Sequence, residues 1–74
     1  MTYDEKLELI ENLSNHYFKK TKAAINEGDS RQANDLWERA TGLETAFLIL
    51  KFDAYAEIVK EDLEEQEIIE RSKR

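Results

Sequence analysis

The stretch Glu27-Gly28-Asp29-Ser30 decides the fold of this 74-residue chain. Gly28 suits the left-handed backbone conformation that commonly ends a helix, and either Asp29 or Ser30 can cap the helix that follows. A connection this short turns the second helix back antiparallel to the first. The sequence therefore predicts an all-α fold, an antiparallel helical hairpin with its turn at residues 28–29.

On the N-terminal side of the turn, the sequence predicts an amphipathic helix over about residues 3–27. Thr2 and Glu5 have the spacing of a capping box, in which each side chain bonds the backbone of the other residue. Apolar residues then recur at helical spacing, with Thr21 bridging one gap. The predicted apolar side consists of Tyr3, Leu7, Ile10, Leu13, Tyr17, Ala24 and Ile25.

On the C-terminal side, a long second helix is predicted over about residues 30–71, which makes residues 1–74 a single helical domain. Its apolar seam consists of Leu36, Ala40, Leu43, Phe47, Leu50 and Ala54. Gly42 lies within this seam, and two interpretations stay open. One is a continuous helix, in which a close helix–helix contact at Gly42 and Ala46 offsets the cost of about 1 kcal/mol of an interior glycine. The other is a helix broken near Gly42, with Thr41 capping a third helix.

A second apolar stripe follows on roughly the opposite side of the second helix. A helix that is apolar on two faces has to be covered on both, and the first helix covers one of them. We therefore expect a homodimer in which two hairpins form a four-helix bundle. The alternative is a frayed end whose apolar residues stay in water. The residues predicted to carry self-association are Phe52, Tyr55, Val59 and Leu63.

Acidic residues are concentrated in two segments of the chain, which has 17 acidic and 11 basic residues and a formal net charge of −6. Residues 53–70 hold eight acids and one base, and residues 1–11 hold four acids and one base. In a hairpin both segments lie at the end away from the turn, where they would face a basic surface of a protein partner and steer association. The alternative is that the charge only keeps this end soluble. The predicted partner-binding acids are Asp53, Glu57, Glu61, Glu64, Glu65, Asp4 and Glu8.

The composition argues against enzymatic, metal and cofactor chemistry. The chain has no Cys and one His, which excludes thiolate and multi-histidine metal sites. No Ser or Thr has a base and an orienting acid nearby, and no Gly-rich phosphate loop is present. The acidity disfavours direct binding to nucleic acid and to anionic membranes. Without a signal peptide or an apolar run of the ~20 residues that a bilayer span needs, we expect a cytoplasmic protein.

Two resemblances add to this interpretation. Gly28-Asp29, Ala33 and the stretch Leu36-Trp37-Glu38-Arg39-Ala40 resemble the turn and second helix of one tetratricopeptide repeat. As a short, acidic, all-helical chain, the sequence also resembles small proteins that phages encode to inhibit host proteins. Some members of that class mimic DNA and occupy the DNA-binding channel of a protein such as a sliding clamp. This resemblance implies a non-enzymatic inhibitor; the alternative is a small structural or assembly protein that acts through homo-oligomerisation.

Overall fold

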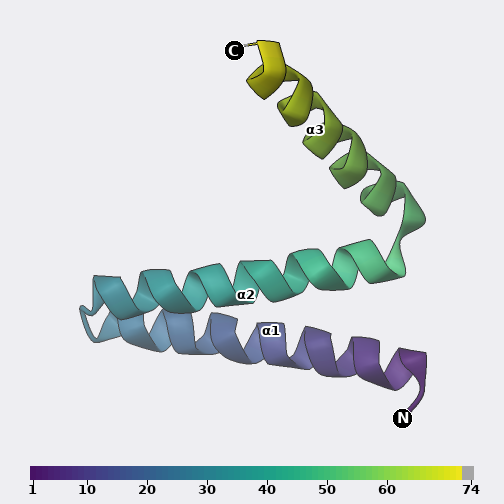
Figure 1. The fold of residues 1–74 in the computed structure, drawn as a ribbon. Coiled ribbons are helices and arrows are strands. Elements are labelled where there is room, and N and C mark those ends of the chain that lie inside the picture. The colour runs from purple at the N-terminus through teal and green to yellow at the C-terminus, as the bar shows by residue number, and fades with distance from the viewer. Residues whose placement is uncertain (73–74) are drawn as a thin grey trace.

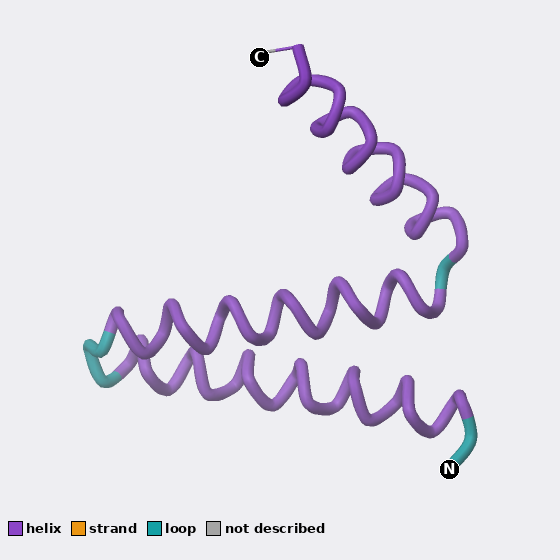
Figure 2. Tube along the Cα trace, in the orientation of Figure 1, coloured by secondary structure: helices purple, strands orange, loops and turns teal. Residues whose placement is uncertain are grey.

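The computed structural model describes residues 1–72, in which three helices and no strand are present: α1 (Tyr3–Asn26), α2 (Ser30–Lys51) and α3 (Asp53–Ser72). α1 and α2 lie side by side as an antiparallel hairpin, and α3 leaves the far end of α2 and diverges from both (Figure 1). The predicted all-α fold is therefore confirmed. The chain departs from helix at its N-terminus, at the hairpin turn and at the joint before α3 (Figure 2).

The start of α1 has the predicted capping box. The Thr2 hydroxyl accepts a hydrogen bond from the Glu5 N–H at 3.2 Å, and the Glu5 carboxylate accepts one from the Thr2 N–H at 3.5 Å. These two bonds satisfy amide groups that have no partner inside the helix. α1 therefore begins where its sequence pattern indicates.

The hairpin turn is built around Gly28, whose φ of 77° is the one positive value among the described residues. The N–H of Gly28 donates to the carbonyl of Ile25, and the N–H of Asp29 donates to that of Ala24, which is the Schellman arrangement. The Asp29 carboxylate then accepts a hydrogen bond from the N–H of Gln32 at 3.1 Å. Asp29 is therefore the N-cap of α2, and Ser30 is its first helical residue.

The core is the seam between α1 and α2, where residues alternate at spacings of three and four. From α1 the seam takes Leu7, Ile10, Ser14, Tyr17, Thr21 and Ala24, and from α2 it takes Ala33, Leu36, Ala40, Leu43 and Phe47. Ser14 and Ala40 are completely buried. Small residues such as Ser14 and Ala40 at the middle of a seam let two helices approach closely there.

The register of the hairpin is set by contacts at both of its ends. Near the open end, the hydroxyl of Tyr3 donates a hydrogen bond to the backbone carbonyl of Leu50. Toward the turn, the ring of Phe18 packs edge-on against that of Trp37, with 5.3 Å between the ring centres. The first turn of α1 therefore lies beside the last turn of α2.

The prediction of one long second helix over residues 30–71 is wrong in one respect, because the helix is interrupted at Phe52. α2 runs unbroken through Gly42 and ends at Lys51, and Phe52 is extended, with φ −120° and ψ 109°. The expected close contact at Gly42 is also absent, since a Cβ added there would meet no atom within 4 Å. The break thus lies ten residues after the glycine, at a position with neither Gly nor Pro.

α3 stands away from the hairpin. Within residues 1–72 it contacts α2 alone, and only Tyr55, Ala56 and Val59 are half-buried among its described side chains. The Cα radius of gyration is 16.1 Å, against about 11 Å for a compact domain of this length. Most of the third helix therefore has no packing partner within its own chain.

Candidate functional site

Helix α3 carries two chemically different faces. Residues three or four apart share one side of a helix. One set, which we name the inner face, consists of Phe52 at the joint and of Tyr55, Val59 and Leu63. The other set, which we name the outer face, consists of Asp53, Glu57, Glu61 and Glu64. At 100° per residue, these two sets lie on nearly opposite sides of the helix.

The inner face is turned toward α2. Tyr55 and Val59 are half-buried, and α2 is the element that α3 contacts in the described part of the chain. Farther along, α3 has diverged, and Leu63 is 63% exposed. The inner face is therefore covered only at its first turns, while the carboxylates of the outer face point away from the hairpin.

Glu65 follows Glu64 and lies beside the outer face, fully in solvent. Among residues 1–72, the one ion pair closer than 4 Å joins Arg71 to Glu67 at 3.1 Å, at the far end of α3. The outer-face carboxylates and Glu65 thus have no basic side chain within that distance in the described part of the chain. Their charge is available to a partner.

The other two predicted acids, Asp4 and Glu8, lie on the first turns of α1. With Leu7, Glu11, Phe47 and Lys51 they line a shallow hollow between α1 and α2. The Lys51 ammonium lies 5.2 Å from the centre of the Phe47 ring. Because Lys51 lines the same hollow as Asp4 and Glu8, its positive charge reduces the net negative charge of this hollow.

The structure does not gather all the predicted acids at one tip. The two acidic segments lie at the same end of the hairpin, but α3 makes no contact with α1 in the described part of the chain and diverges from the hairpin (Figure 1). Composition and hairpin topology could not show this separation, because it follows from the bend at Phe52. The acidic surface therefore consists of the projecting helix α3 and a smaller acidic patch on the first turns of α1.

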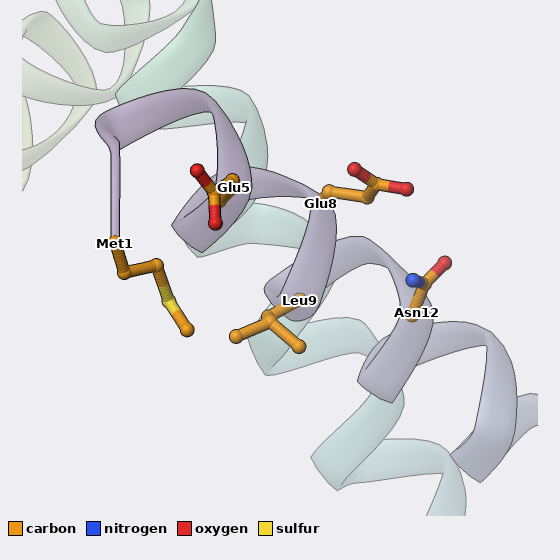
Figure 3. Close-up of a pocket in the computed structure, with 5 residues that line it drawn as sticks. All are labelled: Met1, Glu5, Glu8, Leu9 and Asn12. Atoms are coloured by element: carbon orange, nitrogen blue, oxygen red, sulfur yellow. The ribbon is translucent and has the colours of Figure 1, made fainter.

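A second hollow lies along α1 alone and is lined by Met1, Glu5, Glu8, Leu9 and Asn12 (Figure 3). The Met1 side chain turns toward Leu9, and the two carboxylates lie above them. All five residues come from one helix and the residues just before it, so the hollow cannot enclose a substrate. Over residues 1–72, no group of three or more His, Cys, Asp or Glu side chains is arranged to hold a metal ion.

An apolar trough on one side of the hairpin was not anticipated from the sequence. Its lining comes from Leu13 and Tyr17 of α1 and from Glu38, Arg39, Gly42 and Leu43 of α2. The sequence pattern placed Leu13 in the seam, but Ser14 occupies that position and Leu13 is 43% exposed. Gly42 leaves the floor of the trough open.

No helix in the described part of the chain has the length and apolar character needed to cross a bilayer. Comparison of the sequence and fold with protein-family models, with curated proteins and with solved structures finds no match. The two faces of α3 are therefore the basis for a functional proposal.

Proposed function

We propose that this protein is a non-enzymatic interaction module whose outer face on α3 engages a basic surface of a partner protein. The observation that carries the proposal is the exposed row of Asp53, Glu57, Glu61 and Glu64, which has no ion pair within residues 1–72 and lies on a helix that projects from the hairpin. A row of like charges on a projecting element attracts an oppositely charged surface and raises the association rate. The absence of cysteine is in keeping with a partner in the reducing cytoplasm.

The spacing of charge along α3 supports a DNA-mimic version of this proposal. At a rise of 1.5 Å per residue, residues 53–70 span about 27 Å, and their eight acids and one base give one net negative charge per about 3.9 Å. One strand of B-DNA carries one phosphate charge per about 3.4 Å of helix axis. α3 thus presents roughly the linear charge density of a single DNA strand, which fits a channel that binds DNA, such as that of a sliding clamp.

The test compares two triple variants that change the net charge equally. One is Glu57→Lys, Glu61→Lys and Glu64→Lys on the outer face; the control is Glu27→Lys, Asp35→Lys and Glu38→Lys on the hairpin. A partner captured from lysate with the unaltered chain is purified, and its affinity for each chain is measured over a range of salt concentrations.

We expect the outer-face triple to lose binding and the control triple to keep it. The affinity of the unaltered chain should fall as salt rises, and duplex DNA should compete for the partner. Equal binding by both triples, with no dependence on salt, would contradict the electrostatic proposal.

A second candidate function is a structural or assembly role through homo-oligomerisation, for which the large accessible surface is the specific observation. The chain exposes 6220 Å², whereas a folded monomer of 8.7 kDa exposes about 4,700 Å². Self-association through Phe52, Tyr55, Val59 and Leu63 would cover part of the difference, in keeping with the four-helix bundle expected from the sequence. An assembly role predicts that Leu63→Glu disrupts function while the outer-face triple has no effect.

A further inference from the structure

We propose that α3 of a second copy of this chain binds in the wedge between α2 and α3. The two chains then form a dimer with a two-fold axis near Val59. The wedge is defined by the inner face of α3 and by Thr45, Leu48 and Ile49 of α2. This inference rests on the second candidate function above, homo-oligomerisation, and says which surfaces form the interface. It is independent of any partner of the outer face.

The α2 side of the wedge is suited to an apolar helix. Leu48 and Ile49 lie off the seam that α2 shares with α1, yet both are half-buried, and α3 is the other element that contacts α2. The Thr45 hydroxyl donates a 2.8 Å hydrogen bond to the carbonyl of Thr41 in its own helix. With that hydroxyl satisfied, Thr45 can offer its methyl group to an arriving helix without leaving the hydroxyl unpaired.

The chain cannot fill this wedge by itself. The joint is the single residue Phe52, and α3 diverges from α2 after it (Figure 1). Ile58 and Leu63 are 55% and 63% exposed. A one-residue joint does not let α3 fold back against α2, so its apolar residues stay in water unless a second molecule covers them.

The amount of exposed surface matches what a dimer would bury. The accessible area exceeds that of a compact monomer by about 1,500 Å², and obligate dimers bury about 1,000–2,500 Å² on each chain. A flexible tail would also expose surface, but α3 is a regular helix with an apolar face. The excess therefore leaves enough exposed surface for a dimer interface of this size, of which the inner face supplies the apolar part.

The placement of the outer-face charges is compatible with a second copy as the occupant. Two α3 helices carry many acids between them, and a face-to-face contact that included Glu57, Glu61 and Glu64 would be repulsive. These three carboxylates lie on the side of α3 opposite to Val59, so two inner faces can meet while they stay in solvent, and Asp62, three residues after Val59, lies at the edge of the contact. A two-fold contact uses the same surface on both chains, so the inner face of one chain would pack against the inner face of the other.

The register of the dimer follows from the inner face. Tyr55 and Leu63 each lie four residues from Val59, one before it and one after it. Antiparallel pairing about Val59 places Tyr55 of each chain against Leu63 of the other and the two Val59 side chains beside each other. Packed helix axes lie about 8–10 Å apart, which brings facing residues near the axis within reach of a disulfide.

The test uses the absence of native cysteine. Val59→Cys should form a disulfide-linked dimer under mild oxidation, whereas Glu57→Cys, two residues earlier on the outer face, should not. Sedimentation equilibrium of the unaltered chain should give twice the mass of 8.7 kDa, and Leu63→Glu should return it to 8.7 kDa. Leu63 is largely exposed within its own chain, so circular dichroism should show that this variant keeps its helices.

A monomeric mass for the unaltered chain at high concentration, or a dimeric mass for Leu63→Glu, would overturn the inference. So would cross-linking of Val59→Cys no faster than that of Glu57→Cys; if the unaltered chain is then still dimeric, the assembly role stands and the wedge is the wrong surface. The triple Glu57→Lys, Glu61→Lys and Glu64→Lys should remain a dimer, which separates this test from that of the outer face.

Discussion

The hydroxyl of Ser14 on α1 donates a 3.0 Å hydrogen bond across the hairpin to the backbone carbonyl of Ala40 on α2. Both residues are completely buried, at the centre of the seam. A bond from a side chain as short as serine to the backbone of the neighbouring helix requires the two helices to lie close together. The hairpin is thus held by close backbone approach at its middle, with larger apolar side chains such as Leu7 and Phe47 toward its open end.

We expect Ser14→Ala to destabilise the chain by about 1 kcal/mol, the usual net value of one buried hydrogen bond. Ala40 keeps the bond to its carbonyl within α2, so no buried group is left without a partner. Ser14→Leu, which adds apolar volume, should cost about 1–3 kcal/mol because it forces the helices apart. Urea unfolding followed by the fluorescence of Trp37, which contacts Phe18, measures both values.

The control for this prediction is Ser30→Ala. Ser30 is exposed and follows the N-cap Asp29, so its loss should change stability by no more than about 0.5 kcal/mol. Stabilisation by Ser14→Leu would show that the helices are farther apart than the structure indicates.

The two glycines should respond in opposite directions to alanine. Gly42→Ala should stabilise α2 by about 1 kcal/mol, because the site is helical and a Cβ meets nothing within 4 Å. Gly28→Ala should destabilise the hairpin by about 1 kcal/mol, because φ is 77° and an L-residue is strained there. Thermal unfolding by circular dichroism compares the two. A loss of stability in Gly42→Ala would indicate that another molecule packs against this glycine.

The ends of the hairpin could be predicted from the sequence because they depend on local chemistry. Thr2 and Glu5 cap α1, and Gly28 and Asp29 form the turn, and each does so through hydrogen bonds within a few residues. These interactions depend on residue type and spacing alone. They do not depend on how the helices later pack.

The seam was predicted only in part, because two of its positions are polar. Ser14 and Thr21 are buried, while Leu13 and Ile25, which the apolar pattern selected, are exposed. Thr21 was predicted to bridge a gap in the apolar side, but Ser14 was missed; a strict alternation of three and four from Leu7 would have found it. The Thr21 hydroxyl bonds the carbonyl of Tyr17 in its own helix, so its burial leaves no unsatisfied group.

The bend at Phe52 could not be predicted, because no glycine, proline or capping pattern marks it. The N–H of Phe52 still donates to Leu48 at 2.9 Å, and its carbonyl accepts from the N–H of Ala56 at 3.1 Å. One rotated residue thus redirects a whole helix while these two hydrogen bonds are kept. That rotation also determines the direction of the outer face. The geometry of the candidate site therefore could not be predicted from sequence patterns.

The bend makes a specific prediction about proline. Asp53→Pro should be tolerated, because Asp53 is the first residue of α3 and Phe52 already has the extended conformation that precedes proline. Ala56→Pro should reduce the helicity of α3, since it removes the hydrogen bond from Ala56 to Phe52 and costs about 3 kcal/mol. Circular dichroism at 222 nm distinguishes the two variants. An equal loss of helicity in both would mean that the chain runs helical through Phe52 in solution.

Hydrogen exchange rates should differ between the hairpin and α3. Amides of α1 and α2 along the seam should exchange slowly, whereas those of α3 beyond about residue 60 should exchange rapidly in dilute protein. Within its own chain, α3 is half-buried only at Tyr55, Ala56 and Val59, and an isolated helix of this length is marginal in water. If a second copy covers the inner face, raising the protein concentration should slow exchange along α3. It should leave the seam around Ser14 unchanged, because that seam is complete within one chain. Slow exchange of α3 in a sample that sedimentation shows to be monomeric would contradict this, because it would mean that the chain itself covers the inner face.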